Sequence, residues 1–154
     1  HQNRVFRFLL RMMNCREEAL ELTQDTMLKA FRALPSWRPD AAFGTWLFHI
    51  ASNAATDRLR RKKLVRYEPI EEHMDFPDPA AGPEEELQLA QRYRLLEAAL
   101  QRLQADYRQV LLLREVEEMS YAEIGEVLGL REGTVKSRIA RARQALLEVC
   151  KGRI

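Results

Sequence analysis

The sequence has few of the residues that many catalytic and secreted proteins depend on. Only 6 of the 154 residues are glycine, and no glycine-rich loop that could cradle a phosphate is present. The two cysteines, Cys15 and Cys150, lie near opposite ends without C-x-x-C spacing, which excludes a disulfide scaffold or zinc ribbon and fits a reducing compartment. No apolar run approaches the roughly 20 residues that cross a bilayer, and nothing in the opening residues predicts export. We therefore expect no nucleotide-binding α/β enzyme, no secreted mini-protein and no membrane insertion.

Charge is plentiful but segregated along the chain. Residues 57–66 carry six basic side chains against one acidic, residues 68–86 carry eight acidic and no Lys or Arg, and residues 131–153 carry seven basic against two acidic. Two basic blocks separated by an acidic one predict two polyanion-facing surfaces joined by a segment that repels polyanions. Basic runs are also common on solvated helix faces, so charge alone leaves both interpretations open.

Residues 67–83 predict a connector between two domains. Four of the 6 prolines fall in this segment, and it shows no helical or strand periodicity. We expect an all-α protein with two small helical domains, residues 1–66 and 84–154, joined by a flexible, acidic, Pro-rich linker, residues 67–83. Domains of this size bury only about 60% of their unfolded surface, so partners are expected to contribute to their stability.

Two long helices are expected in the first domain after its opening helix. The first covers about residues 17–34 and has an apolar stripe of Leu20, Thr23, Met27, Phe31 and Leu34. A second stripe on the same helix consists of Glu18, Glu21 and Asp25, with Gln24 beside it. Acidic residues stabilise the first turn of a helix, which explains Glu17 and Glu18 but not Asp25.

The next helix is expected over about residues 41–63. Its buried stripe is predicted to be Phe43, Trp46, Leu47, Ile50 and Ala54. Its polar face carries His49, Asn53, Thr56 and Arg60, and its basic end carries Arg58, Arg60 and Arg61, which suit phosphate. Aromatic residues beside basic ones can stack on single-stranded bases, and Trp37, Trp46 and Phe48 lie near the start of this helix. A place in the core is the better interpretation for Phe43 and Trp46, whereas Trp37 lies in a loop.

The second domain carries a helix-turn-helix pattern. Leu87, Ala90, Leu95, Ala98 and Leu103 are expected on the apolar side of a helix that begins near residue 84, and Asp106 with Gln109 predicts a capping box for the next one. Ser120 and Glu123 form a second capping box, Gly125 allows two helices to approach, and Gly129 makes the turn. The last helix presents Thr134, Lys136, Ser137, Arg138, Ala140, Arg141 and Arg143 on or beside its outward face. This set predicts contacts with bases and phosphates in the major groove, although such helix pairs also occur as plain structural hairpins.

These motifs resemble the extracytoplasmic-function (ECF) sigma factors of the bacterial sigma-70 family. The resembling stretches are ELTQD at 21–25, TWLFHIASN at 45–53, DRLRR at 57–61, LLREV at 112–116, SYAEI at 120–124 and GTVKSRIARAR at 133–143. Together they cover nearly the whole chain outside the linker, in the family's order and spacing.

The resemblance implies an alternative sigma factor that binds core RNA polymerase and directs promoter-specific transcription initiation. Glu21, Gln24 and Asp25 would dock on the clamp helices of the β′ subunit. The helix over 41–63 and the loop near 37–42 would open the −10 element and read it as a single strand, with Asn53 at a base-contacting position. The last helix would read the −35 element as duplex, while the β flap holds that domain on the polymerase.

The resemblance also implies a cytoplasmic protein controlled by an anti-sigma factor, through which it can be tethered at the inner membrane. No catalytic site, metal, cofactor or small-molecule substrate is expected. Two positions depart from the family pattern: Phe48 stands where Tyr is common, and His49 stands where a basic residue is common. His49 carries less positive charge near neutral pH, which weakens the case for a phosphate contact there.

Two other functions are weighed against this one. A helix-turn-helix repressor or activator would need a sensor or dimerisation domain, and would bind duplex DNA alone with nanomolar affinity. The histidines His1, His49 and His73 show no metal-ligand spacing that would support a sensor. An enzyme is the third candidate, but no Cys/His or Ser/His/Asp set is brought together by helical placement.

Overall fold

A computed structural model describes residues 1–40, 42–65 and 84–152 of the chain. These residues form helices and loops without a β-strand, which confirms the all-α prediction. The expected linker, residues 67–83, lies outside the described residues. The elements are α1 (Gln2–Met13), α2 (Arg16–Ala33), the short 3-10 turn η1 (Leu34–Ser36), α3 (Phe43–Val65), α4 (Glu84–Gln101), α5 (Ala105–Leu111), the π-helical turn η2 (Leu112–Val116), α6 (Tyr121–Leu128) and α7 (Glu132–Lys151).

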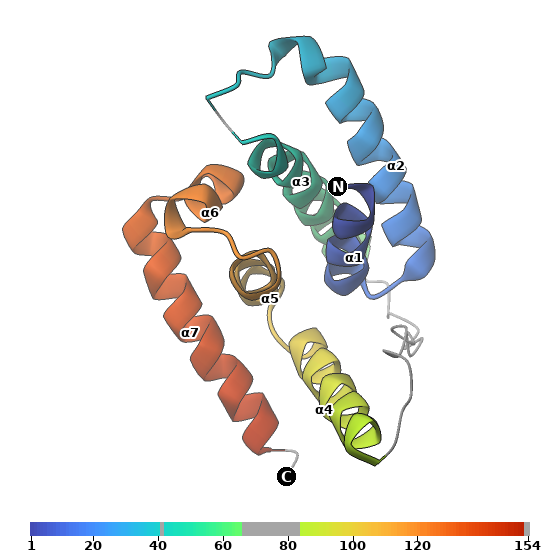
Figure 1. The fold of residues 1–154 in the computed structure, drawn as a ribbon, viewed down its shortest axis with the longest axis vertical. Helices are drawn as coiled ribbons and strands as arrows, with labels where there is room; N and C mark the ends of the chain where they lie inside the picture. Colours follow the sequence, from blue (N-terminus) through green and yellow to red (C-terminus); the bar gives the residue numbers. More distant parts are fainter. Residues whose placement is uncertain (41, 66–83, 153–154) are drawn as a thin grey trace.

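Helices α1, α2 and α3 form the first unit and pack around large apolar side chains of α1. Val5, Phe8 and Leu9 are almost completely buried, and the ring of Phe8 meets the ring of Phe48 from α3 edge-on at 5.4 Å between centroids. Helix α1 ends at Asn14, whose φ of 52° is left-handed, a conformation that Asn adopts more readily than most residues. This turn returns the chain along α1 as α2 (Figure 1).

The predicted apolar stripe of α2 is wrong in most of its members. The residues of α2 that are actually buried are Ala19, Leu22, Thr23, Thr26 and Ala30, so Thr23 alone belongs to both sets. Phe31 is 77% exposed, and Leu20 and Leu34 are also exposed. Both sets have helical spacing, so periodicity did not separate them. The buried set consists mainly of small side chains, which lets α2 approach α1 and α3 closely.

Helix α3 confirms its predicted stripe, since Phe43 and Ile50 also pack against the core, and it corrects one aromatic residue. Leu47 and Ala54 are buried, and Trp46 is half-buried against the core. Phe48, expected among the base-stacking aromatics, has no exposed surface because it fills the centre of the first unit. The role expected for Phe48 is therefore wrong.

The helix-turn-helix of the second unit has the predicted geometry. Ser120 Oγ accepts from Glu123 N at 3.1 Å, and Glu123 Oε1 accepts from Ser120 N at 3.0 Å, which completes the capping box of α6. Gly129 ends α6 with φ 67°, a value that favours glycine. A Cβ on Gly125 would lie 2.7 Å from the carbonyl oxygen of Leu130, so glycine is required where α6 meets the turn.

Two other predictions for the second unit are wrong. Helix α5 has Gln104 at its N-cap, so Asp106 lies inside the first turn and forms no capping box with Gln109. The predicted apolar side of α4 is wrong for Leu87 and Leu95, which are each more than half exposed, whereas Leu103 just after the helix is buried. The buried residues of α4 lie near its C-terminal end and are Glu97, Ala99 and Leu100.

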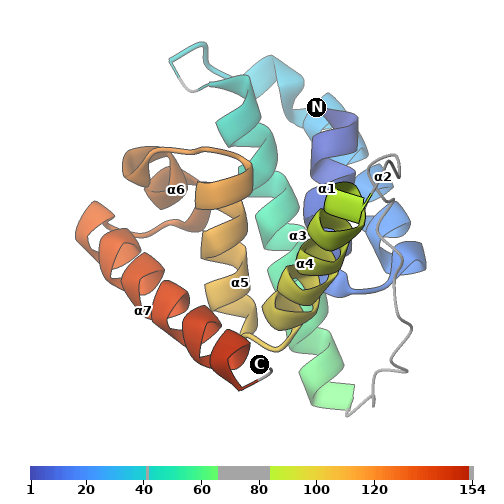
Figure 2. The same ribbon diagram turned by 60° about the horizontal axis from the view of Figure 1, so that its bottom comes forward.

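The two units pack directly against each other. Helix α6 lies against the first half of α3, while α4 and α5 meet α1, as the two views in Figures 1 and 2 agree. One continuous cluster of buried apolar side chains runs from Val5 and Phe8 in α1 to Ile139 and Ala142 in α7. The units are therefore joined by a shared core as well as by the chain.

Candidate polymerase and nucleic-acid interfaces

Helix α7 presents the predicted DNA-reading side chains to solvent. Thr134, Lys136, Ser137, Ala140, Arg141 and Arg143 are exposed, and Arg138 is half-buried. The opposite side of the helix is fixed by Val135, Ile139 and Ala142, none of which is more than 1% exposed. The anchored apolar side leaves the basic side free to enter a groove.

Not every cation on α7 is equally available. Arg143 donates to Glu115 from Nη2 at 2.6 Å, and this hydrogen bond raises the pKa of Arg143 above its ordinary value. Arg141 has no such bond and projects from the outward face, and the ammonium of Lys136 lies 5.7 Å from the centre of the Tyr121 ring. Arg141 is thus better placed than Arg143 for direct contact with a base edge.

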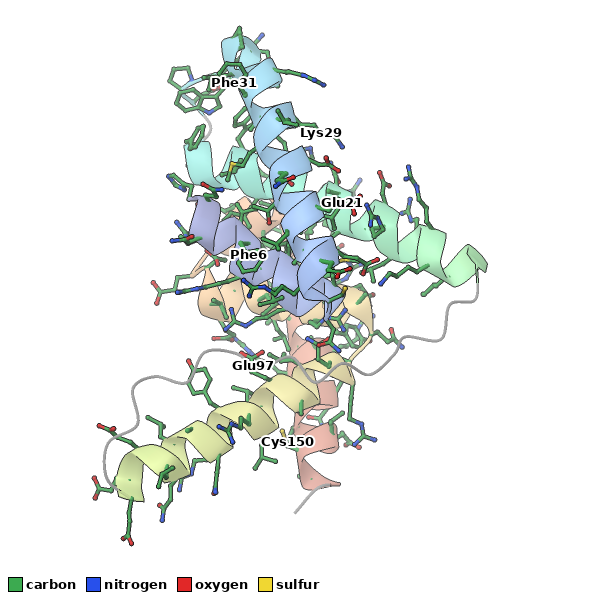
Figure 3. All side chains as sticks on the ribbon, turned by 90° about the vertical axis from the view of Figure 1, so that its right-hand side faces the viewer. Phe6, Glu21, Lys29, Phe31, Glu97 and Cys150 are labelled. Atoms are coloured by element: carbon green, nitrogen blue, oxygen red, sulfur yellow. The ribbon has the colours of Figure 1, made fainter. Side chains whose placement is uncertain are left out.

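The acidic face of α2 is exposed as expected. Glu21, Gln24 and Asp25 all face solvent, and Glu21 is labelled on this face in Figure 3. Arg58 donates from Nη2 to Glu21 Oε1 at 2.8 Å, and this hydrogen bond lowers the pKa of Glu21. Lys62 pairs with Glu18 on the same side. The expected polymerase face and the basic end of α3 are therefore neighbours that share ion pairs.

The polar face of α3 lies along the second unit. Thr45 Oγ1 donates to Glu123 Oε2 at 3.1 Å, and His49 donates from Nδ1 to the carbonyl oxygen of Val127 at 2.9 Å. Asn53 remains exposed, with its amide nitrogen 3.3 Å from the other ring nitrogen of His49. Helix α6 thus occupies one edge of the predicted −10 face.

The remaining predicted −10 residues lie on either side of this contact. Thr56 is half-buried and accepts from Gln109 at 3.5 Å, whereas Arg60 and Arg61 are exposed. At the other end, Trp37 is half-buried and meets Phe43 edge-on at 5.6 Å. Trp37 therefore lies beside the start of α3, whereas the basic residues Arg60 and Arg61 lie near its end.

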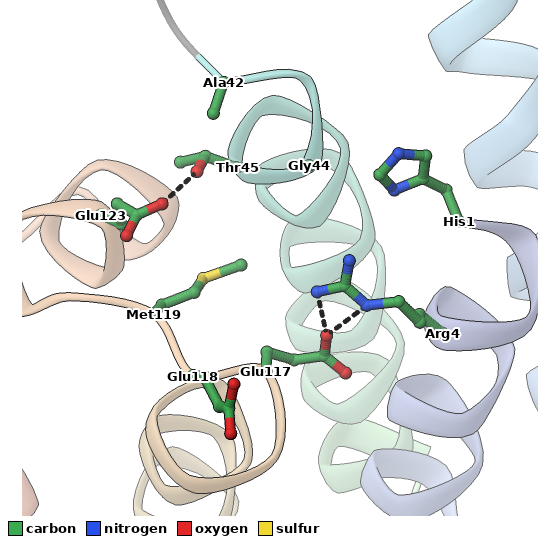
Figure 4. A pocket seen from close by; sticks show the side chains of 9 residues that line it. All are labelled: His1, Arg4, Ala42, Gly44, Thr45, Glu117, Glu118, Met119 and Glu123. Carbon is green, nitrogen blue, oxygen red and sulfur yellow. Dashed lines mark hydrogen bonds and ion pairs between the residues drawn. The ribbon is translucent and has the colours of Figure 1, made fainter.

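A cavity of about 240 Å³ opens between the units beside the start of α3 (Figure 4). Its wall includes Glu118 and Glu123 from the second unit, and Arg4 of α1 donates to Glu117 there from Nε and Nη2 at 2.9 and 2.6 Å. Within the residues that the structure describes, no group of His, Cys, Asp or Glu is arranged to hold a metal ion. The Arg4–Glu117 ion pair in the wall of this cavity links α1 to the second unit.

Comparison with known proteins assigns both units. The Sigma-70 region 2 family model matches residues 1–65, and the Sigma-70, region 4 family model matches residues 93–146. The ECF RNA polymerase sigma factor SigM of Mycobacterium tuberculosis is 36% identical over 146 residues, covering 95% of this chain and 71% of that protein. The RNA polymerase sigma-H factor of Pseudomonas aeruginosa is 32% identical over 154 residues, covering 95% and 80%. This chain belongs to the ECF sigma factors of the sigma-70 family.

Another ECF sigma factor is more similar in sequence but longer. SigE of Mycolicibacterium smegmatis is 38% identical over 149 residues, and the chain spans 57% of its length. Sigma factors are transcription regulators. From here on, region 2 denotes the unit formed by residues 1–65 of this sigma factor, and region 4 denotes the unit formed by residues 84–152. Among the described helices of this sigma factor, none is both long and apolar enough to cross a membrane.

Two solved structures share the arrangement of both regions. The sigma factor RpoE from Bartonella quintana, solved with the anti-sigma factor NepR, gives a TM-score of 0.80 at 27% identity over 97% of this chain and 91% of that chain. CnrH, solved with the cytosolic domain of CnrY, gives 0.68 at 26% identity over 99% and 83%. Since one superposition covers nearly the whole chain, the likeness extends to the way the regions pack together.

Sequence reasoning missed a polar cluster between the regions, here named the α1 clasp. Gln101 donates from Nε2 to the carbonyl oxygen of Arg11 at 2.7 Å, and Arg108 donates from Nη2 to the carbonyl oxygen of Met12 at 2.6 Å. Arg11 also donates from Nε to Glu97 Oε1 at 2.9 Å. The acceptors of Gln101 and Arg108 are backbone carbonyls, which have no sequence signature, so no sequence signal pointed to the clasp.

Proposed function

We propose that this sigma factor carries the −35 reader on α7 and the −10 reader on α3. The observation that carries the proposal is the outward face of α7, where six of the seven predicted DNA-binding side chains are exposed while the apolar side is locked into the region 4 core. A recognition helix needs this division between an anchored side and a free basic side. For α3, support comes from the exposed Asn53, Arg60 and Arg61, which share one helix with polar and basic character.

We further propose that the acidic face of α2 docks on the clamp of the polymerase β′ subunit. Glu21 and Asp25 are exposed and lie beyond the first turn of α2, where the helix dipole no longer accounts for acidic residues. Region 4 would be held on the polymerase by the β flap. The function is promoter recognition without enzymatic activity.

The docking face is tested by charge reversal. In the double variant Glu21→Lys with Asp25→Lys, pull-down of core RNA polymerase should be lost while helical circular dichroism is unchanged. Glu126→Lys with Glu148→Lys makes the same change in net charge on exposed residues of region 4 and should bind core polymerase normally. Normal binding by the α2 variant would contradict the assignment.

Promoter-directed initiation itself is tested by run-off transcription. Core polymerase with this chain should initiate from a subset of a promoter library, and the selected templates should share a −35 and a −10 element. A repressor would instead bind duplex DNA tightly alone and add nothing to core polymerase. That pattern would contradict the proposed function.

We also infer control by an anti-sigma factor. The support is that RpoE of Bartonella quintana, which shares the packing of both regions, was solved with one. Exposed apolar side chains on both regions offer surface for such a partner, including Leu28 and Phe31 of α2 and Leu87 and Tyr93 of α4. A protein encoded beside this chain should form a stable complex with it and abolish run-off transcription, and an anti-sigma factor held in the inner membrane would localise the complex there.

A further inference from the structure

Arg58 lies on the side of α3 that packs on α2. It is two residues away from both Thr56 and Arg60, and two residues turn an α-helix by about 200°, so Arg58 points away from the side that those residues share. Asn53 and Arg60 are exposed, whereas only 22% of the Arg58 side chain is exposed. Arg58 is therefore turned away from the face of α3 that carries the proposed −10 reader.

Carboxylates of α2 hold the guanidinium of Arg58. Its Nη2 donates to Glu21 Oε1 at 2.8 Å, and its Nη1 lies 3.7 Å from Glu18 Oε1. The hydrogen bond to Glu21 raises the pKa of Arg58 against the effect of burial, and the charges of Glu18 and Asp25 add to the rise. A DNA phosphate at Arg58 would lie beside these carboxylates and be repelled by them. The surroundings of Arg58 therefore suit a role on the acidic face of α2 better than contact with a nucleic acid.

Lys62 makes a second link of the same kind. It lies four residues after Arg58, so the two cations are neighbours on the surface of α3. Lys62 pairs with Glu18 Oε2, while Glu18 Oε1 faces Arg58. The side chain of Glu18 is only 19% exposed. Glu18 is thus fixed from one side by Lys62, and it fixes Arg58 from the other.

Glu21 is the most exposed of the two carboxylates that Arg58 contacts. Its side chain is 59% exposed although Oε1 takes the hydrogen bond from Arg58, and a carboxylate can accept further hydrogen bonds at its other oxygen. Figure 3 shows Glu21 where α2 and α3 cross. A glutamate that nothing holds loses rotamer freedom when a partner fixes it, and this loss reduces affinity. Because Arg58 already orients Glu21, a partner that binds Glu21 meets less of this cost.

We propose that Arg58 is a positioning residue of the polymerase-binding face, which holds Glu21 in the orientation that meets the β′ clamp, and that it does not bind the −10 strand. The inference rests on the proposed docking of α2. It moves Arg58 from the residues expected to contact DNA to those that prepare the protein contact. Glu18, held by Lys62, keeps the guanidinium of Arg58 in place.

Arg58→Met tests this role in the full chain with core RNA polymerase. Methionine keeps an apolar stem and removes the donors. In a titration of the labelled sigma factor with core polymerase, the affinity should fall about two- to tenfold, which corresponds to the cost of ordering one freed side chain. Loss of a cation from an acidic face would by itself strengthen attraction to a basic partner, so a fall in affinity identifies positioning rather than charge.

A double-mutant cycle shows whether Arg58 acts through Glu21. In a Glu21→Ala background, Arg58→Met should cause no further loss of polymerase affinity, and Arg58→Lys alone should recover part of it. An equal loss in both backgrounds, or unchanged affinity in Arg58→Met while Glu21→Ala binds weakly, would overturn the proposal. Normal binding by Glu21→Ala would instead contradict the docking of α2, on which the proposal rests.

Binding of single-stranded DNA measures the other half of the proposal. A fluorescent A/T-rich strand of ten nucleotides, followed by fluorescence anisotropy at several salt concentrations, should bind Arg58→Met within about twofold of the wild type and with the same salt dependence. Arg60→Met removes the same charge from the exposed side of α3 and is the matched control. It should weaken binding and reduce the slope of log K against log salt by about 0.7, as expected for one phosphate contact on a single strand.

The two variants give three distinguishable results. An equal loss of affinity and slope in Arg58→Met and Arg60→Met would overturn the exclusion of Arg58 from DNA binding. A loss in Arg60→Met alone supports it. If both variants bind the strand as the wild type does, the assignment of α3 to the −10 element is contradicted, while the exclusion of Arg58 stands.

Discussion

At the scale of single residues, the contact of Gly125 with the turn after α6 sets the shape of the helix-turn-helix. A methyl group there would lie 2.7 Å from the backbone oxygen of Leu130, which cannot move aside as a flexible side chain would. We expect Gly125→Ala to lower the free energy of unfolding by about 1–3 kcal/mol, as overpacking does in cores. Chemical denaturation followed by circular dichroism measures this change.

Gly133 provides the matched control. It lies in the first turn of α7, and a Cβ there would have nothing within 4 Å. Gly133→Ala should leave stability unchanged or raise it by about 0.5–1 kcal/mol, because alanine loses less backbone entropy in a helix. A loss of stability in Gly133→Ala equal to that of Gly125→Ala would show that the close approach is not the cause.

A further prediction for a single residue concerns Arg141 and the binding of DNA. Its guanidinium is exposed on α7 without the carboxylate that pairs with Arg143. Arg141→Ala should cost about 1–3 kcal/mol at one base position of the −35 element and relax specificity there. Binding measured across single-base variants of the −35 element checks this, and uniform weakening at every position would mean that Arg141 contacts phosphate only.

At the scale of elements, the capping box of α6 also links α6 to region 2. Glu123 accepts from Ser120 N and from Thr45 Oγ1, and the backbone hydrogen bond, supported by those from the Ser120 and Thr45 side chains, lowers its pKa. A carboxyl with a lowered folded-state pKa adds stability at pH values above its ordinary value of 4.5, and loses that contribution as the pH falls through the folded value. The start of α6 should therefore weaken in acid.

Glu123→Gln separates the cap from its charge. Glutamine can still complete a capping box, so stability at pH 7 should change little, while the loss of stability as the pH falls below about 4.5 should become smaller than in the wild type. Ser120→Ala should instead cost about 1 kcal/mol at pH 7. Urea midpoints measured at several pH values check both predictions. If the urea midpoint of Glu123→Gln falls at low pH as much as that of the wild type, other carboxyl groups cause the acid sensitivity.

How far the sequence predicts these elements depends on what specifies each one. The α6–α7 pair was predictable because caps and turns need particular residues, Ser120, Glu123 and Gly129 among them. The inner faces of α2 and α4 were not, since their apolar residues fit more than one stripe, and Leu87 and Leu95 of α4 are more than half exposed among the described residues. Phe48 was misassigned because proximity in sequence to basic residues does not reveal which way a helical side chain points.

At the scale of the whole molecule, the sequence indicated two domains but not their packing. Each region alone has the composition of a small helical domain, and the linker pattern implied independence. The shared cluster of buried residues and the α1 clasp depend on groups that pair only after both regions have folded. A sequence pattern records local periodicity, and it carries little information about a polar contact between Arg108 and a distant carbonyl.

The shared core predicts that the two regions unfold together. Both tryptophans, Trp37 and Trp46, lie in region 2, so fluorescence reports region 2 while circular dichroism reports all helices. Ile139 is 1% exposed in region 4, and Ile139→Val should lower stability by about 0.5–1.5 kcal/mol. If the regions unfold as one unit, the fluorescence midpoint should fall as much as the dichroism midpoint, although the substituted residue belongs to region 4.

The same substitution in a chain without the α1 clasp provides the contrast. With Gln101→Met and Arg108→Met also present, region 2 should no longer sense Ile139→Val, so the fluorescence midpoint should stay fixed while the dichroism curve shifts or divides into two transitions. Additivity fails between coupled sites and holds between independent ones, so the difference between the two backgrounds measures the coupling carried by the clasp. A fluorescence midpoint that ignores Ile139→Val in the wild-type background as well would mean that the regions fold independently even when packed together, with the shared cluster contributing little to either one.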